Sequence, residues 1–153
     1  MARPLGADST RDGRGVAVAD LDGDGRLDVV LSNNNAPPTV YLNRLGHTGN
    51  WVRLTLAGNK GNRDAIGARV RLTVKAGDQC KTMTRQVEAG SGYASQSETA
   101  VHFGLGGTTR IEAIEVTWPG GTTQRFEADQ LAGLANCPVE LEEGGIPKKR
   151  LPR

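Results

Sequence analysis

Four aspartates crowd into nine residues of this chain, in the stretch D-L-D-G-D-G-R-L-D that spans residues 20–28. Two unit charges about 4 Å apart repel by roughly 1 kcal/mol in water, and by more where solvent is partly excluded. A bound cation reverses the sign of this repulsion. Counted from Asp20, carboxylates fall at positions one, three, five and nine, and a backbone carbonyl falls at seven, a spacing that can wrap oxygens around a hard ion. The predicted metal ligands are Asp20, Asp22, Asp24, the carbonyl of Arg26, and Asp28.

Calcium is the predicted ion, because it accepts about six to eight oxygens in flexible geometry whereas magnesium prefers a strict octahedron and keeps its waters. Gly25, at position six, permits the sharp bend that such a loop needs. An EF-hand would lie between helices with a glutamate at position twelve, but Leu31 stands there and the flanks have strand character. The alternative is an Asp-Gly hairpin turn without an ion, which explains the glycines but leaves the aspartates unexplained.

The residues that must position this loop follow the period of a β-strand. From residue 16 onward, alternation of apolar and polar side chains is far commoner than helical spacing, and glycine, with 21 residues, interrupts it throughout. The chain is therefore predicted to be all-β. Asparagines and prolines in 33–38 interrupt the pattern, since proline cannot donate to a ladder. The expected strands span 16–19, 27–31, 39–43, 52–56, 68–75, 79–88, 99–103, 114–118 and 122–126, with a short helix or turn in 128–134.

Composition sets the broad class. The chain has 153 residues, of which 37% are hydrophobic and 24% charged, as in ordinary globular proteins. Its formal charge is only +2, so no nucleic-acid partner is predicted. The densest positive cluster, 148–153, is predicted to be a frayed terminus rather than a binding arm. No apolar run reaches the length of a membrane span, and the first residues lack the apolar core of a signal peptide.

The chain has two cysteines, Cys80 and Cys137. They are too few for a disulfide scaffold and wrongly spaced for a zinc site. Sequence does not say whether their Cα atoms lie within bonding reach, so one disulfide and two unpaired thiols remain equally compatible with it.

Residues that could support catalysis form no recognisable motif. No serine or cysteine near His47 or His102 completes a nucleophile pattern, and His102 is predicted to be structural. Asp64, Glu88 and Glu98 could pair for glycoside hydrolysis, but spacing along the chain does not give the separation that this mechanism requires. The chain is therefore predicted not to be an enzyme.

Two loops are candidates for recognition. Asn62, Arg63 and Asp64 could form a polar recognition surface, or Arg63 and Asp64 could merely pair with each other at little net energy. Tyr93, in a loop rich in glycine and serine, is the best single candidate for an exposed contact. The alternative for Tyr93 is packing over a neighbouring strand.

Two regions resemble known domains. Residues 15–33, G-V-A-V-A-D-L-D-G-D-G-R-L-D-V-V-L-S-N, resemble the FG-GAP/VCBS repeat, the calcium-loop blade of integrin-type β-propellers and many secreted bacterial proteins. Five later motifs resemble, in the same order, the ASPIC/UnbV domain of the cartilage acidic protein-like family, in which this domain follows the last FG-GAP blade. These motifs are N-W-V-R-L-T-L (50–56), G-N-R-D-A-I-G-A-R-V (61–70), G-S-G-Y-A-S-Q-S (90–97), V-H-F-G-L-G (101–106) and V-T-W-P-G-G (116–121).

The resemblance implies a fold class, namely a partial β-propeller-like blade with a calcium loop, followed by a β-sandwich-like domain. Two or three strands cannot close a propeller, and an isolated sheet of that size is marginal. We therefore expect the C-terminal portion of a longer exported protein, or a truncated reading frame of one, whose blade packs against missing propeller blades. The expected parts are a flexible N-terminus (1–14), an incomplete FG-GAP/VCBS blade (15–45), the ASPIC/UnbV domain (49–127) and a C-terminal tail (128–153).

The resemblance also implies an extracellular, periplasmic or cell-surface location. The predicted function is that of a non-catalytic calcium-binding module, which presents its β domain for interaction or adhesion with a protein or glycan partner that the sequence does not identify. One alternative is an enzyme or biosynthetic accessory protein, which a pocket with convergent histidines and carboxylates would favour. The other is a structural cap on a β-propeller, which predicts that the isolated chain aggregates or exposes the edge of its first strand.

Overall fold

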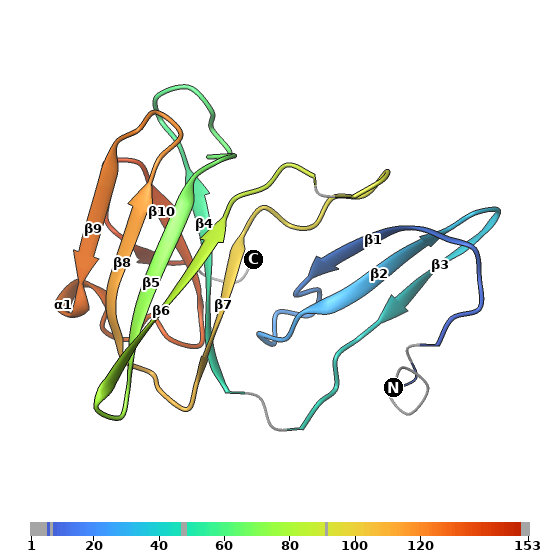
Figure 1. Ribbon diagram of the computed structural model, residues 1–153, viewed down its shortest axis with the longest axis horizontal. Coiled ribbons are helices and arrows are strands. Elements are labelled where there is room, and N and C mark those ends of the chain that lie inside the picture. The colour runs from blue at the N-terminus through green and yellow to red at the C-terminus, as the bar shows by residue number, and fades with distance from the viewer. Residues whose placement is uncertain (1–5, 7, 47–48, 91, 151–153) are drawn as a thin grey trace. The chain divides into compact units, whose positions relative to one another are not determined.

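The computed structural model describes residues 6, 8–46, 49–90 and 92–150. The chain divides into an N-terminal unit, residues 1–46 and 89–98, and a C-terminal unit, residues 47–88 and 99–153. Strands dominate both units (Figure 1), and the described residues contain one short helix, α1 (Ala128–Leu131). The predicted all-β class is therefore confirmed.

The N-terminal unit contains a three-stranded antiparallel sheet in the order β1-β2-β3. Its strands are β1 (Gly13–Ala19), β2 (Asp28–Asn33) and β3 (Ala36–Tyr41). Apolar residues form a short run in each of β1 and β2, and these two strands flank the acidic stretch as predicted. The sheet is therefore the element that holds the two ends of the acidic loop together.

The break in the strand pattern that was predicted for residues 33–38 is shorter in the structure. Pro37 and Pro38 lie within β3. Neither proline is needed as a ladder donor, because β3 is an edge strand and its register with β2 passes from Leu31–Thr39 to Asn33–Ala36 across an irregularity that leaves both prolines without a ladder partner. The turn between the strands is confined to residues 34–35, where Asn35 has a φ of 50°, a left-handed conformation that asparagine tolerates.

The segment 89–98 packs along the outer edge of β1. The Val18 N–H donates to the Ser97 hydroxyl at 3.1 Å, and the Glu98 N–H donates to the Val18 carbonyl at 3.4 Å. The approach is close enough that a Cβ on Gly15 would lie 3.1 Å from the carbonyl oxygen of Ala94. The motif at 90–97, which resembles part of the ASPIC/UnbV domain, thus covers the outer edge of β1 at Val18. The alternative of a structural cap predicted that this edge could be exposed.

The N-terminal unit has no buried apolar core of its own. Among the described residues, every buried hydrophobic side chain lies in the C-terminal unit. The N-terminal unit instead leaves large apolar side chains exposed, including Val16 at 52%, Val40 at 51% and Leu45 at 59%. A three-stranded sheet with so little buried apolar surface has a small stability reserve.

The C-terminal unit is a sandwich of two four-stranded sheets, ordered β11-β10-β4-β7 and β6-β5-β8-β9. One apolar cluster takes side chains from both sheets, among them Val52 and Phe103 from the first and Leu72 and Ile114 from the second. This confirms the predicted β-sandwich-like domain. The strands are β4 (Asn50–Ala57), β5 (Arg69–Ala76), β6 (Gln79–Gln86), β7 (Val101–Gly106), β8 (Ile111–Thr117), β9 (Thr123–Glu127), β10 (Pro138–Glu142) and β11 (Lys148–Lys149).

The predicted C-terminal tail, 128–153, is wrong for its central part. Strand β10 pairs in parallel with β4 and lies between β4 and β11. Val139 and Leu141 on this strand are both 0% exposed. With only two apolar positions the strand has too short a pattern to stand out by periodicity, and its partner lies more than 80 residues earlier in the chain.

Both cysteines are free thiols. Cys80 is exposed, whereas the half-buried Cys137 donates its S–H to the Leu134 carbonyl, with a sulfur-to-oxygen distance of 3.2 Å. Burial raises the pKa of the Cys137 thiol. Of the two compatible states, the structure has the unpaired one. In the part of the chain that the structure describes, no helix is long and apolar enough to cross a membrane.

Glu143 fastens the turn after β10 to the loop after β4. Its Oε2 accepts from the Asn59 N–H at 3.1 Å and the Lys60 N–H at 3.2 Å, and its Oε1 accepts from the Thr122 hydroxyl at 3.0 Å. These bonds, that from Asn59 foremost, favour the carboxylate and lower the pKa of Glu143 from its usual 4.5.

A folded-state pKa below the unfolded one means that the stabilisation by Glu143 is present above pH 4.5 and is lost as pH falls through the lowered value. We therefore expect the free energy of unfolding of the C-terminal unit to decline below pH 4.5 less steeply in Glu143→Gln than in the wild type. Urea unfolding at successive pH values measures this slope. Glu142→Gln, at an exposed neighbouring position, is the control, and parallel curves for wild type and Glu143→Gln would contradict the assignment.

Candidate metal centre

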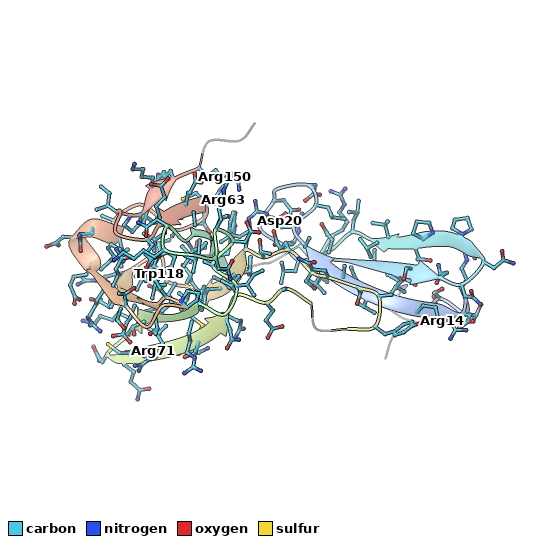
Figure 2. The ribbon with its side chains drawn as sticks, turned by 90° about the horizontal axis from the view of Figure 1, so that it is seen from above. Arg14, Asp20, Arg63, Arg71, Trp118 and Arg150 are labelled. Atoms are coloured by element: carbon cyan, nitrogen blue, oxygen red, sulfur yellow. The ribbon has the colours of Figure 1, made fainter. Side chains whose placement is uncertain are left out.

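The acidic loop joins β1 to β2 and is closed by the pairing of Ala19 with Asp28. This pairing places Asp20, which follows β1, close to the start of β2; Figure 2 labels its side chain. Within the loop, Gly23 and Gly25 have φ values of 76° and 85°, which residues with a Cβ rarely adopt. The glycines therefore let the chain turn back sharply enough for the aspartates to converge.

Three of the predicted ligands meet in one cluster. Asp20, Asp22 and Asp28 each offer a carboxylate oxygen, and these atoms all lie within 4.8 Å of one another. Oxygens bound to one calcium ion at about 2.3–2.6 Å can be at most about 5 Å apart. Among the described residues, no other set of three or more histidines, cysteines or carboxylates comes together in this way.

Backbone amides hold two of these carboxylates in place. Asp28 is 1% exposed, and its two oxygens accept from the Leu21 N–H at 2.9 Å and the Asn43 N–H at 2.7 Å. Asp20 is 8% exposed, and its Oδ2 accepts from the Gly25 N–H at 3.0 Å. Neutral donors orient a carboxylate without cancelling its charge, and each oxygen has a second lone pair.

Asp24 lies outside the cluster. Its carboxylate accepts from the backbone N–H of Arg26 at 2.8 Å and forms an ion pair with the Arg26 guanidinium. Asp22, which is in the cluster, also lies 3.7 Å from the guanidinium of Arg44. The structure therefore brings together three of the four predicted carboxylates and pairs the fourth with the residue whose carbonyl is predicted to coordinate.

The donor set fits a hard cation. All the converging atoms are carboxylate oxygens, the ligands that calcium prefers, and the cluster contains none of the sulfur or imidazole donors that favour zinc or copper. Two of the three carboxylates are buried, where mutual repulsion is stronger than in water. A divalent cation would relieve that repulsion at less structural cost than moving either side chain to solvent.

The sequence did not identify the groups that support the cluster. Asn43, which donates its backbone N–H to Asp28, follows β3 and was assigned only to a strand. Arg44, which lies beside Asp22, belongs to no motif in the sequence. Such partners depend on where β3 returns along β2, and the spacing of the aspartates contains no information about that.

The residues considered for catalysis form no active-site cluster in the described part of the chain. The ring of His102, on β7, stacks on that of Trp51, on β4, with centroids 5.9 Å apart and planes inclined by 14°. This contact agrees with a structural role. His47 lies outside the described residues.

Of the recognition candidates, Tyr93 is 82% exposed, so it does not pack over a strand. The Asn62 amide donates to the Ile66 carbonyl at 2.9 Å and shapes its own loop. Arg63 and Asp64 are exposed and form no ion pair with each other in the structure described here. Figure 2 labels Arg63 on this loop. The structure thus leaves both side chains accessible.

The chain is similar to curated proteins called cartilage acidic protein 1. It is 40% identical over 119 residues to the protein of Xenopus tropicalis, an alignment that covers 74% of this chain and 18% of that protein. With the protein of Homo sapiens it shares 39% identity over 133 residues, covering 84% of this chain and 19% of the relative. The chain therefore spans less than a fifth of the length of the curated relatives it matches.

Two family models match the chain in the order that the motifs indicated. The FG-GAP repeat matches residues 13–49, which contain all of β1, β2, β3 and the acidic loop. The family described as ASPIC and UnbV matches residues 58–135, about half of the chain and most of the sandwich. The chain belongs to the ASPIC and UnbV family, with an FG-GAP repeat directly before that domain.

Proposed function

We propose that the chain is a non-catalytic calcium-binding module of an exported protein, in which the FG-GAP repeat and the ASPIC/UnbV domain act together in extracellular or cell-surface interaction. The observation that carries this proposal is the convergence of oxygens from Asp20, Asp22 and Asp28 within 4.8 Å. When bound, calcium supplies positive charge at this convergence and joins the two ends of the loop. The extracellular location rests on the family membership.

Residues of the chain hold the carboxylates in position for the ion. The Leu21 and Asn43 amides fix Asp28, and the Gly25 amide fixes Asp20. Asp22 is the most exposed member of the cluster and stands at its solvent side. Asp24 and the Arg26 carbonyl complete the proposed ligand set, and Asp24 must leave the Arg26 guanidinium to take part.

The exposed apolar side chains of the N-terminal unit support a place within a larger propeller. Val16, Val40 and Leu45 are each more than half exposed, and burial of such side chains stabilises by about 1.5–3 kcal/mol each. Further FG-GAP blades are the partners that an incomplete blade of this family requires. The module would then close the propeller at one end and present the sandwich beyond it.

Calcium is expected to stabilise the N-terminal unit of the wild type and to have no such effect on Asp22→Ala. A ligand that binds only the folded state adds about 2.7 kcal/mol at a hundredfold excess over its Kd. Thermal unfolding, followed during calcium titration, measures the shift in midpoint. Asp22→Ala removes one converging carboxylate whose ion pair, with Arg44, is exposed and long at 3.7 Å, so the variant is expected to fold without calcium.

Asp8→Ala is the matched control, since it removes one exposed carboxylate from the same unit outside the cluster. It is expected to respond to calcium as the wild type does. If the wild type shows no shift at millimolar calcium, or if Asp22→Ala shifts equally, the calcium proposal fails. Magnesium at the same concentration is expected to give a smaller shift.

A further inference from the structure

The β5–β6 hairpin is the most basic part of the chain. Residues 69–86 contain five cationic side chains and one aspartate, an excess of four positive charges in a protein whose formal charge is only +2. All five cationic residues are exposed. Positive charge is thus concentrated on one edge of the sandwich, and the rest of the chain is slightly acidic. The cations are Arg69, Arg71, Lys75, Lys81 and Arg85.

Three of these cations form a stripe on the outer face of the sheet. Val70, Leu72 and Val74 point into the core, so Arg69, Arg71 and Lys75 alternate with them and point outward. Figure 2 shows Arg71 at the surface of the C-terminal unit. At about 3.3 Å per residue, the stripe from Arg69 to Lys75 is about 20 Å long.

Neutralisation of this stripe is only partial. Arg71 lies 3.3 Å from Glu115, which also lies 3.6 Å from Arg125 on β9, and Arg125 in turn pairs with Glu127 at 2.6 Å, so these two guanidinium groups face two carboxylates. Arg69 and Lys75 form no ion pair with any residue that the structure describes. Unshared positive charge therefore remains at both ends of the stripe.

The residues beside the stripe on the neighbouring strands carry hydroxyl groups. Thr84 is opposite Arg71 on β6, and Thr82 is opposite Thr73, with their hydroxyl oxygens 3.0 Å apart. On the other side Thr117 is opposite Arg69. Hydroxyls beside cations supply hydrogen bonds to sulfate, carboxylate and sugar hydroxyl groups alike.

In the part of the chain that the structure describes, no aromatic side chain lies on this face. Phe103, Trp118 and Phe126 are buried, Trp51 belongs to the other sheet, and both tyrosines belong to the N-terminal unit. Proteins that hold single-stranded nucleic acid combine positive charge with aromatic rings on which bases stack. The face offers charge and hydroxyls without such rings, which favours a polymer whose anionic groups stand along a sugar chain.

We propose that the outer face of the β5–β6 hairpin binds an acidic polysaccharide, along a stripe formed by Arg69, Arg71 and Lys75. The guanidinium groups pair with sulfate or carboxylate groups, and the neighbouring threonines donate to oxygens of the sugar chain. Since the stripe lies outside the metal-binding loop, the proposal does not depend on calcium.

Binding of the full chain to immobilised heparin and to hyaluronan tests the proposal and separates sulfate from carboxylate recognition. In Arg69→Gln/Arg71→Gln/Lys75→Gln, we expect the affinity for at least one of them to fall about tenfold or more at physiological salt, and the salt dependence to become shallower. An unchanged thermal midpoint of the C-terminal unit shows that the variant is folded.

The control is Lys60→Gln/Lys148→Gln/Lys149→Gln, which removes the same charge from exposed positions outside the hairpin. It is expected to bind within about twofold of the wild type, since cations beyond a Debye length contribute little. Equal losses in the two variants, or no binding of the wild type to either polysaccharide, would overturn the proposal. Tighter binding to a DNA duplex of equal charge would overturn it in favour of nucleic acid.

Discussion

Asp28→Ala is expected to unfold the N-terminal unit while the C-terminal unit stays folded. The substitution leaves the amides of Leu21 and Asn43 without the carboxylate that they bond at 2.9 and 2.7 Å. A hydrogen bond to a charged group contributes about 1.5–3 kcal/mol, so the loss of both amounts to about 3 kcal/mol or more. Among the residues of this unit that the structure describes, no apolar side chain is buried that could offset such a loss.

The two units have separate intrinsic probes. Trp51 and Trp118 lie in the C-terminal unit, and Tyr41 and Tyr93 lie in the N-terminal unit. We expect Asp28→Ala to leave the tryptophan fluorescence transition unchanged and to remove the protection of β1 and β2 amides from hydrogen exchange. Asp28→Asn keeps one carbonyl acceptor and is expected to have a smaller effect. If β1 and β2 amides stay protected in Asp28→Ala, the carboxylate does not support the sheet.

The position of the acidic loop between two strands follows from local features of the sequence. Aspartates at fixed positions and glycine at 25 lie within nine residues, and the flanking apolar residues confine the loop to a turn between two strands. Few backbone paths satisfy both conditions. The convergence of Asp20, Asp22 and Asp28 could therefore be predicted from charge and spacing alone.

The pairing of Asp24 with Arg26 could not be predicted from the sequence, although both residues lie in the same loop. The sequence indicated that Asp24 and the Arg26 carbonyl serve one ion, and it gave no weight to the Arg26 side chain. In the structure that side chain supplies the positive charge that faces Asp24. Charge spacing identifies repulsion but does not say which cation relieves it.

The segment 89–98 illustrates a second limit. Its glycines and serines indicated a loop, and the exposure of Tyr93 agrees with that interpretation. Its contacts with Val18 and Gly15 join residues about 80 positions apart, through one hydroxyl and backbone groups. Such contacts have no hydrophobic periodicity, so no pattern in the sequence could report them. The consequence is that a motif of the ASPIC/UnbV domain contributes to the unit that holds the acidic loop.

Leu141→Ala is expected to destabilise the C-terminal unit by about 3 kcal/mol, within the range of about 2–5 kcal/mol for leucine truncation in a packed core. Leu141 is 0% exposed on β10, opposite Leu56 of β4, and its side chain belongs to the cluster that both sheets share. Urea unfolding followed by tryptophan fluorescence measures the loss. Glu140→Ala, at the exposed adjacent position of the same strand, is expected to change stability by less than about 0.5 kcal/mol.

The contrast between Leu141 and Glu140 decides where the domain ends. The match to the ASPIC and UnbV family stops at residue 135, before β10 begins at Pro138. If β10 is part of the folded unit, a chain that ends at Cys137 exposes the edge of β4 and the apolar surface that Val139 and Leu141 cover, so cooperative unfolding should disappear. If the shortened chain is as stable as the wild type, β10 contributes nothing to the stability of the sandwich. The 0% exposure of both side chains argues that the sandwich needs this strand, beyond the residues by which the family is recognised.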